Sequence, residues 1–181
     1  MLGGEHLVTL GAVRALMKKY PNLHILHLDA HTDLRDEYLG EKLSHASVIR
    51  RLWEELGDGR IHQFGIRSGE KVEFEFAEAH MEIHRFNLNG WADALKTLQG
   101  KPVYLTLDLD VLDPSCLPGT GTPEPGGVSF SELLAAVLQL HKVKLVGCDI
   151  VELSPHYDQS GASTAVACKL VREILLQLKG A

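Results

Sequence analysis

The chain has 181 residues, a formal net charge of −6, 45% hydrophobic residues and 23% charged residues. This length suits one domain with a substantial core, and the composition is typical of a soluble globular protein. The acidic balance argues against nucleic acid or an anionic membrane as a partner. No apolar run approaches 18 residues, and the N-terminus lacks the order of a secretory signal, so we expect a cytoplasmic location. Cys116, Cys148 and Cys168 are therefore expected to be reduced thiols.

Short segments rich in branched apolar residues alternate with helical patterns along the chain. A helix is predicted over residues 6–20, where Leu7, Leu10, Val13 and Leu16 have helical spacing and Pro21 ends the pattern. Buried parallel strands are predicted over residues 24–28, 60–66, 82–85, 103–109 and 144–151. Further helices are predicted over residues 47–56, 70–79, 91–98, 129–140 and 163–179. The alternation indicates an α/β fold with three layers around a mainly parallel sheet, in a single domain over residues 1–181.

Two other segments stand out. Residues 1–4 read as the tail of a strand followed by a turn, so we expect that N-terminal sequence, including strands of the sheet, is missing. The loop over residues 113–128 carries four prolines and four glycines and is long for a compact fold. Loops of this kind are often functional, which makes this segment a candidate part of a site.

Acidic residues and a histidine follow the first predicted strand. Asp29, His31 and Asp33 occupy alternate positions, so in extended backbone their side chains point to one side. They would converge at the carboxyl edge of the sheet, where open α/β sheets bind ligands. The alternative is a polar loop in which Asp33 caps the following segment and His31 is solvated.

A second acidic pair ends the strand predicted over residues 103–109. Asp108 and Asp110 share one face, and two carboxylates this deep cannot both stay ionised without a compensating cation. The alternative exposes one of them and pairs the other with loop amides. With His6 as a possible sixth ligand, the set favours two Mn²⁺ ions, roughly 3.5 Å apart, that share carboxylates and a water. Such a pair generates hydroxide at neutral pH and holds it against an electrophilic carbon.

Five motifs in this order resemble the ureohydrolase family of arginases and agmatinases: GGEH at 3–6, DAHTD at 29–33, SHAS at 44–47, DLDVLDP at 108–114 and VE at 151–152. By this resemblance Asp29 and Asp108 would bridge both metals. His6 and Asp33 would complete one ion, and His31 and Asp110 would complete the other. His45 would pass a proton to the departing amine, Asp110 would position the nucleophile, and Glu152 would hold the guanidinium. The non-catalytic alternatives are that His45 is a surface histidine and that Glu152 forms a salt bridge at the rim of the sheet. Thr122 would line the pocket.

The local motifs are most similar to those of bacterial agmatinases. GIRSG at 65–69 and GTGTPEPGG at 119–127 carry this similarity, and residues 34–43 lack the motifs with which arginases hold an α-amino acid. The resemblance implies a small cationic guanidinium substrate, agmatine, hydrolysed to putrescine and urea by a homo-oligomer. Guanidinobutyrate hydrolysis and an arginase-like activity stay open, as does a shortened, non-catalytic chain that binds metal. A receiver-like domain with one Mg²⁺ is a further alternative, but it does not explain His31.

The resemblance also implies a sheet. In an arginase/deacetylase-like fold of eight strands, the five predicted here would be the last five, in the order 8-7-4-5-6. The strand over residues 144–151 would then be an uncovered edge, and His6 would be the least supported ligand. The remaining histidines are expected to be structural or exposed: His24, His27, His62, His80, His84, His141 and His156.

Overall fold

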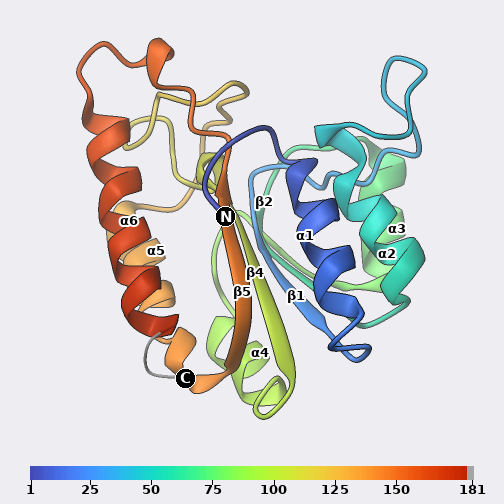
Figure 1. Ribbon diagram of the computed structural model, residues 1–181. Helices are drawn as coiled ribbons and strands as arrows, with labels where there is room; N and C mark the ends of the chain where they lie inside the picture. Colours follow the sequence, from blue (N-terminus) through green and yellow to red (C-terminus); the bar gives the residue numbers. More distant parts are fainter. Residues whose placement is uncertain (179–181) are drawn as a thin grey trace.

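The computed structural model describes residues 1–178 and contains one five-stranded, entirely parallel sheet (Figure 1). Its strands are β1 (His24–Leu28), β2 (Ile61–Ile66), β3 (Glu82–Arg85), β4 (Pro102–Asp108) and β5 (Lys144–Val151). They are arranged in the order β3-β2-β1-β4-β5, which is the order that the family resemblance implied. The predicted strands are all present, with bounds that shift by one residue at most.

Helices cover both faces of the sheet, so the α/β fold with three layers is confirmed (Figure 1). One face carries α1 (Val8–Met17), α2 (Val48–Leu56) and α3 (Lys71–His80); the other carries α4 (Trp91–Thr97), α5 (Phe130–Val137) and α6 (Ala162–Leu178). The first helix is shorter than predicted, because it begins at Val8 and leaves His6 in the segment before it. The predicted end of the last helix, at residues 179 and 180, lies outside the described residues.

Side chains of the central strands alternate between two apolar cores. Leu105 and Leu107 face the core beneath α4, α5 and α6, whereas Tyr104 faces the core beneath α1, α2 and α3. In β1, Leu26 and Leu28 face the first core and Ile25 faces the second. Because alternate residues share a face, His27 and Asp29 lie on the same side of the sheet as Thr106 and Asp108. The polar residues at the strand ends therefore gather under the amino-terminal end of α1.

The N-terminal residues lie along the carboxyl half of β5. Leu2 forms a parallel bridge with Ile150, Gly3 N–H donates to Ile150 O at 2.8 Å, and Glu152 N–H donates to Gly4 O at 3.1 Å. The strand tail that the sequence predicts is reduced to an isolated bridge at Leu2, followed by a bend at Gly4, and these residues cover part of the expected bare edge. They also carry the chain across the sheet edge to His6.

Cys116, Cys148 and Cys168 form no disulfide within the described residues. None of the helices within residues 1–178 has the length and hydropathy needed to cross a membrane.

Candidate metal centre

Four aspartates meet at the carboxyl edge of the sheet. The register pairs Leu28 with Leu107, so the residues that follow them, Asp29 and Asp108, are neighbours at the ends of β1 and β4. Asp29 and Asp110 are each 1% exposed, Asp108 is 3% exposed and Asp33 is 7% exposed. Asp33 has a φ of 53°, a left-handed conformation that is uncommon outside glycine and is often found at functional sites. The structure thus buries both acidic clusters together.

His6 reaches this cluster from the segment before α1. Its Nδ1 atom lies 3.1 Å from Asp29 Oδ2, 3.1 Å from Asp33 Oδ2 and 3.3 Å from Asp108 Oδ2. Burial opposes a charge on the imidazole, yet the three carboxylates around Nδ1 raise the pKa of His6 well above its usual value. A positive charge is therefore favoured at the point where these four side chains converge.

His31 forms a second group that shares Asp29 with the first. Its Nδ1 atom is 3.0 Å from Asp110 Oδ2 and 3.4 Å from Asp29 Oδ1. The two oxygens of Asp29 consequently face different histidines. Side chains able to hold an ion fall into two sets, one with His6, His27, Asp29 and Asp33 and the other with Asp29, His31 and Asp110.

The donor atoms fit a pair of divalent cations. Burial, together with the neighbouring carboxylates, raises the pKa of both Asp108 and Asp110, so these groups resist ionisation without a cation. His6 Nδ1 makes no satisfactory hydrogen bond although three carboxylate oxygens surround it. Carboxylates and imidazole nitrogens around a common point are ligands for hard or borderline divalent metals. The residues thus form a site that could bind metal.

The site opens into a cavity of about 500 Å³. Its wall includes three groups from the sequence predictions that do not lie in the acidic cluster: His45, Thr122 and Glu152. Thr122 Oγ1 is 3.5 Å from Asp110 Oδ2, a weak contact at the inner end. The wall also holds Glu5, Glu70, Glu73 and Arg35, of which Arg35 pairs with Glu70 at 3.0 Å. Carboxylates still outnumber guanidinium groups in this wall, which favours a cationic ligand.

His45 lies at the rim of the cavity, where its side chain is 46% exposed. Its Nδ1 atom is 3.5 Å from Glu5 Oε1, and its ring meets the Tyr38 ring edge-on at 5.3 Å between centroids. The structure therefore leaves this imidazole accessible to a ligand and apart from the buried aspartates.

Glu152 directly follows β5 and has a φ of 61°. Its Oε1 atom accepts a hydrogen bond from the backbone N–H of His6 at 2.7 Å. Burial raises the pKa of this carboxyl group. Glu152 therefore anchors the segment that carries His6, and its Oε2 atom has no protein donor among the described residues.

One histidine that the sequence analysis set aside belongs to the site. His27 is fully buried, and its Nε2 atom lies 2.8 Å from Asp29 Oδ2. Gln63 Nε2 donates to Thr32 O at 2.9 Å and lies 3.0 Å from His27 Nδ1. These contacts make His27 Nε2–H the donor to Asp29 and argue against His27 as a ligand itself. The signal was present, because residues 27 and 29 alternate on one strand face.

Arg67 is a second group that sequence reasoning missed. Its guanidinium donates to Asp110 O at 2.7 Å and to Glu124 O at 2.8 Å, which ties the 113–128 loop to the strand ends. Asp113 completes this anchoring by accepting from Gly126 N–H at 2.8 Å. The long loop is thus held beside the site by hydrogen bonds that no linear motif displays.

A parallel α/β sheet that gathers four buried aspartates, the buried His6 and the partly exposed His31 at its carboxyl edge has the features of a metal-binding enzyme site. The family model named Arginase family matches residues 1–177, and the chain belongs to the arginase family.

Several relatives carry more specific names. The chain is 48% identical to the agmatinase of Bacillus anthracis over 97% of its own length and 62% of that protein. It is 36% identical to the guanidinobutyrase of Pseudomonas aeruginosa, over 99% of the chain and 60% of the relative. The structure of agmatine ureohydrolase from Thermoplasma volcanium matches with a TM-score of 0.87 and 38% identity, over 99% of this chain and 62% of that one. The chain thus spans about three fifths of the length of these relatives.

Proposed function

We propose that this chain hydrolyses agmatine to putrescine and urea with two Mn²⁺ ions. The observation that carries the proposal is the convergence of two imidazole Nδ1 atoms and the buried aspartates on the shared Asp29 side chain. The choice of agmatine rests on the 48% identity to the Bacillus anthracis agmatinase. The carboxylate-rich donor set favours manganese over metals that prefer thiolates.

The proposed ligands divide into two sets. His6 and Asp33 would hold one ion, His31 and Asp110 would hold the other, and Asp29 and Asp108 would belong to both sets. When bound, such ions would lower the pKa of a bound water and so supply a nucleophile at neutral pH. In this proposal residues 1–181 act as one ureohydrolase-like domain in a cytoplasmic homo-oligomer.

The other groups bind the substrate and move protons. Glu152 accepts guanidinium N–H groups through Oε2, because Oε1 is already used by the His6 backbone. Asp110 orients the attacking water through Oδ2, since its Oδ1 accepts from Ala30 N–H at 3.0 Å. The water oxygen bonds to the guanidinium carbon and gives up a proton, and the bond from that carbon to the alkyl nitrogen breaks with its electron pair on nitrogen. His45 delivers a proton to that nitrogen and regains one from the proton that the water gave up. The products are urea and a diamine.

Guanidinobutyrate is the second candidate substrate, because the Pseudomonas aeruginosa guanidinobutyrase is 36% identical to this chain. The two substrates differ at the end far from the guanidinium, where agmatine carries an ammonium and guanidinobutyrate a carboxylate. The carboxylates in the cavity wall favour the ammonium, and this charge preference ranks agmatine first.

The test measures bound manganese per chain and urea release from agmatine, guanidinobutyrate and arginine. We expect two ions and the highest kcat/KM with agmatine. Two ions with preferential turnover of guanidinobutyrate would move the assignment to that substrate. Bound ions without any urea release would instead identify a metal-binding chain without catalysis, and no bound metal would refute the proposal altogether.

A further inference from the structure

A buried hydroxyl lies directly behind His6, on the side away from the carboxylates. Thr106 Oγ1 is 2.9 Å from His6 Nε2, 2.7 Å from Asp149 Oδ1 and 3.3 Å from Thr9 Oγ1. Thr106, Asp149 and Thr9 are all 0% exposed. The register pairs Thr106 of β4 with Asp149 of β5, so the strand pairing itself brings the hydroxyl and the carboxylate together.

The number of available hydrogens determines the direction of these bonds. The Asp149 carboxylate only accepts, and it accepts from Thr106 Oγ1 and from Tyr104 OH, the latter at 2.6 Å. The single hydrogen of Thr106 is therefore used by Asp149, and Thr106 can only accept from its other two partners. It follows that His6 Nε2 carries a hydrogen and donates it to Thr106. In the neutral ring the free lone pair is then on Nδ1, which faces the three aspartates.

We propose that Thr106 and Asp149 are positioning residues that hold the hydrogen on His6 Nε2 and so present the Nδ1 lone pair to the metal centre. This inference rests on the proposed function. A histidine that binds metal through one nitrogen commonly donates its other ring N–H to an oxygen acceptor, and loss of such a partner weakens metal binding. Here the acceptor is the Thr106 hydroxyl, and the Asp149 carboxylate on the neighbouring strand fixes the direction of its hydrogen.

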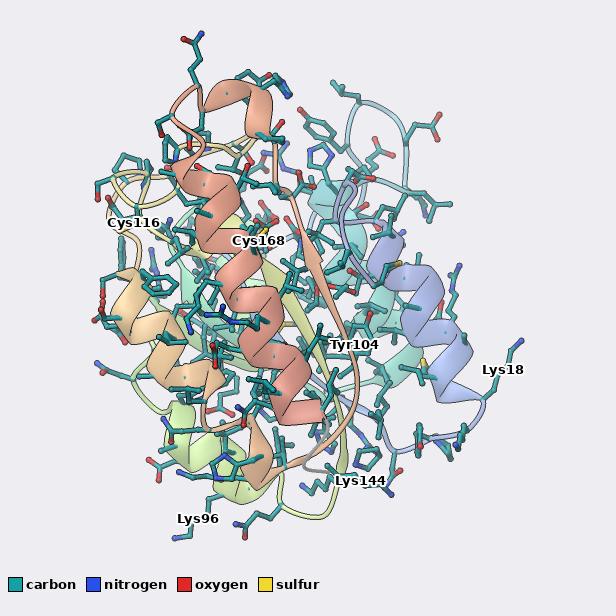
Figure 2. The ribbon with its side chains drawn as sticks, turned by 60° about the vertical axis from the view of Figure 1, so that its left-hand side comes forward. Lys18, Lys96, Tyr104, Cys116, Lys144 and Cys168 are labelled. Atoms are coloured by element: carbon teal, nitrogen blue, oxygen red, sulfur yellow. The ribbon has the colours of Figure 1, made fainter. Side chains whose placement is uncertain are left out.

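Tyr104 provides a matched control for this chain of bonds. Like Thr106, it donates a hydroxyl hydrogen to Asp149, but it bonds to the other carboxylate oxygen and makes no hydrogen bond to His6 among the described residues. In the view of Figure 2 it lies between the ribbons of α1 and α6. Gly147, its register partner on β5, leaves room for the ring, because a Cβ there would be 2.9 Å from the Tyr104 ring. Removing either hydroxyl costs Asp149 one donor, but only Thr106 contacts the imidazole.

The experiment compares Thr106→Val, Thr106→Ser and Tyr104→Phe by calorimetric Mn²⁺ titration, with thermal unfolding to verify folding. We expect Thr106→Val to lower the affinity for one of the two Mn²⁺ ions by about 10–100-fold and to leave the affinity for the other near the wild-type value. Thr106→Ser keeps the hydroxyl and should bind both ions as wild type does. Tyr104→Phe should lower the melting temperature without changing either Mn²⁺ affinity.

Three outcomes separate the possibilities. An equal loss of Mn²⁺ affinity in Tyr104→Phe and Thr106→Val would overturn the inference. It would show that the loss comes from removing a hydrogen-bond donor to the buried Asp149 and not from the contact between Thr106 and His6. Wild-type affinity for both ions in folded Thr106→Val would overturn it as well, and Thr106→Ala replaces this variant if valine prevents folding. A wild-type chain that binds no Mn²⁺ would refute the proposed function instead, before the variants are compared.

Discussion

Both ends of the sheet contain buried histidines, but their surroundings differ. At the carboxyl end, three aspartate oxygens lie within 3.3 Å of His6 Nδ1. At the amino end, His24 of β1 and His62 of β2 stack with ring centroids 5.5 Å apart, and His24 Nδ1 is 3.3 Å from His62 Nε2. A single carboxylate, Glu82, meets this pair through His62 Nδ1 at 2.6 Å.

The contrast appears in the proton affinities. The carboxylates raise the pKa of His6, whereas burial, His62 and the cations Lys101 and Arg60 lower the pKa of His24 to about 4. Burial disfavours a charged imidazole in both places, so the neighbouring charges decide the direction of the shift. The surroundings of His6 at the carboxyl end favour a positive charge, which is the property that a metal site requires, whereas those of His24 at the amino end disfavour one.

The strongest test of the comparison removes the carboxylate shared by both sets of ligands. Asp29→Asn should reduce binding of both ions and lower urea release by more than about 100-fold, beyond the usual effect of losing a residue that only supports a ligand.

Asp110→Asn should reduce binding chiefly of the ion on the His31 side. Metal content per chain and urea assays distinguish the two variants. Two tightly bound ions in Asp29→Asn, or full activity in Asp110→Asn, would contradict the ligand assignment.

At the amino end, His62→Phe should lower the stability of the fold and leave metal binding unchanged. The change removes the partner of Glu82 Oε2 and should lower the free energy of unfolding by about 1–2 kcal/mol. Manganese affinity and urea release should stay at wild-type values, because the pair lies at the opposite end of the strands from the aspartates. Denaturant unfolding and metal titration test this together. A loss of metal binding in the folded variant would show that the two ends are coupled.

The last prediction concerns the pH dependence of stability. Since the pKa of His24 is lowered to about 4 in the folded chain, the unfolded chain binds the proton more readily between the usual value of 6.5 and about 4. His24 therefore contributes a stability that is complete above pH 6.5 and declines as the pH falls toward 4. In His24→Phe this part of the decline should disappear.

Melting temperatures of wild type and His24→Phe at several pH values between 7.5 and 4.5 provide the measurement. The wild-type chain should lose more thermal stability over this range than the variant does. Parallel curves for the two proteins would mean that His24 takes up its proton as easily in the folded chain as in the unfolded one.

Local sequence patterns were sufficient to predict most of the fold. Apolar runs such as residues 144–151 identified the strands, because a parallel strand covered by helices on both faces needs apolar side chains throughout. Helix ends were less exact: α1 begins at Val8 although the apolar periodicity starts one residue earlier. His6 was the ligand with the least local support, and its position depends on Gly3 and Gly4 pairing with β5.

The acidic motifs themselves were visible in the sequence, because DAHTD and DLDVLDP place carboxylates at alternate positions where apolar strands end. The partners of those motifs were only partly visible. His27 shares a strand face with Asp29, whereas Thr106 and Asp149 lie 43 residues apart and are brought together behind His6 only by the register of β4 and β5. The sequence alone therefore determined the strands, the fold class and the residue types able to bind metal. Tertiary structure decided which nitrogen of His6 faces the aspartates, because hydrogen-bond direction depends on neighbours that only the packed sheet brings together.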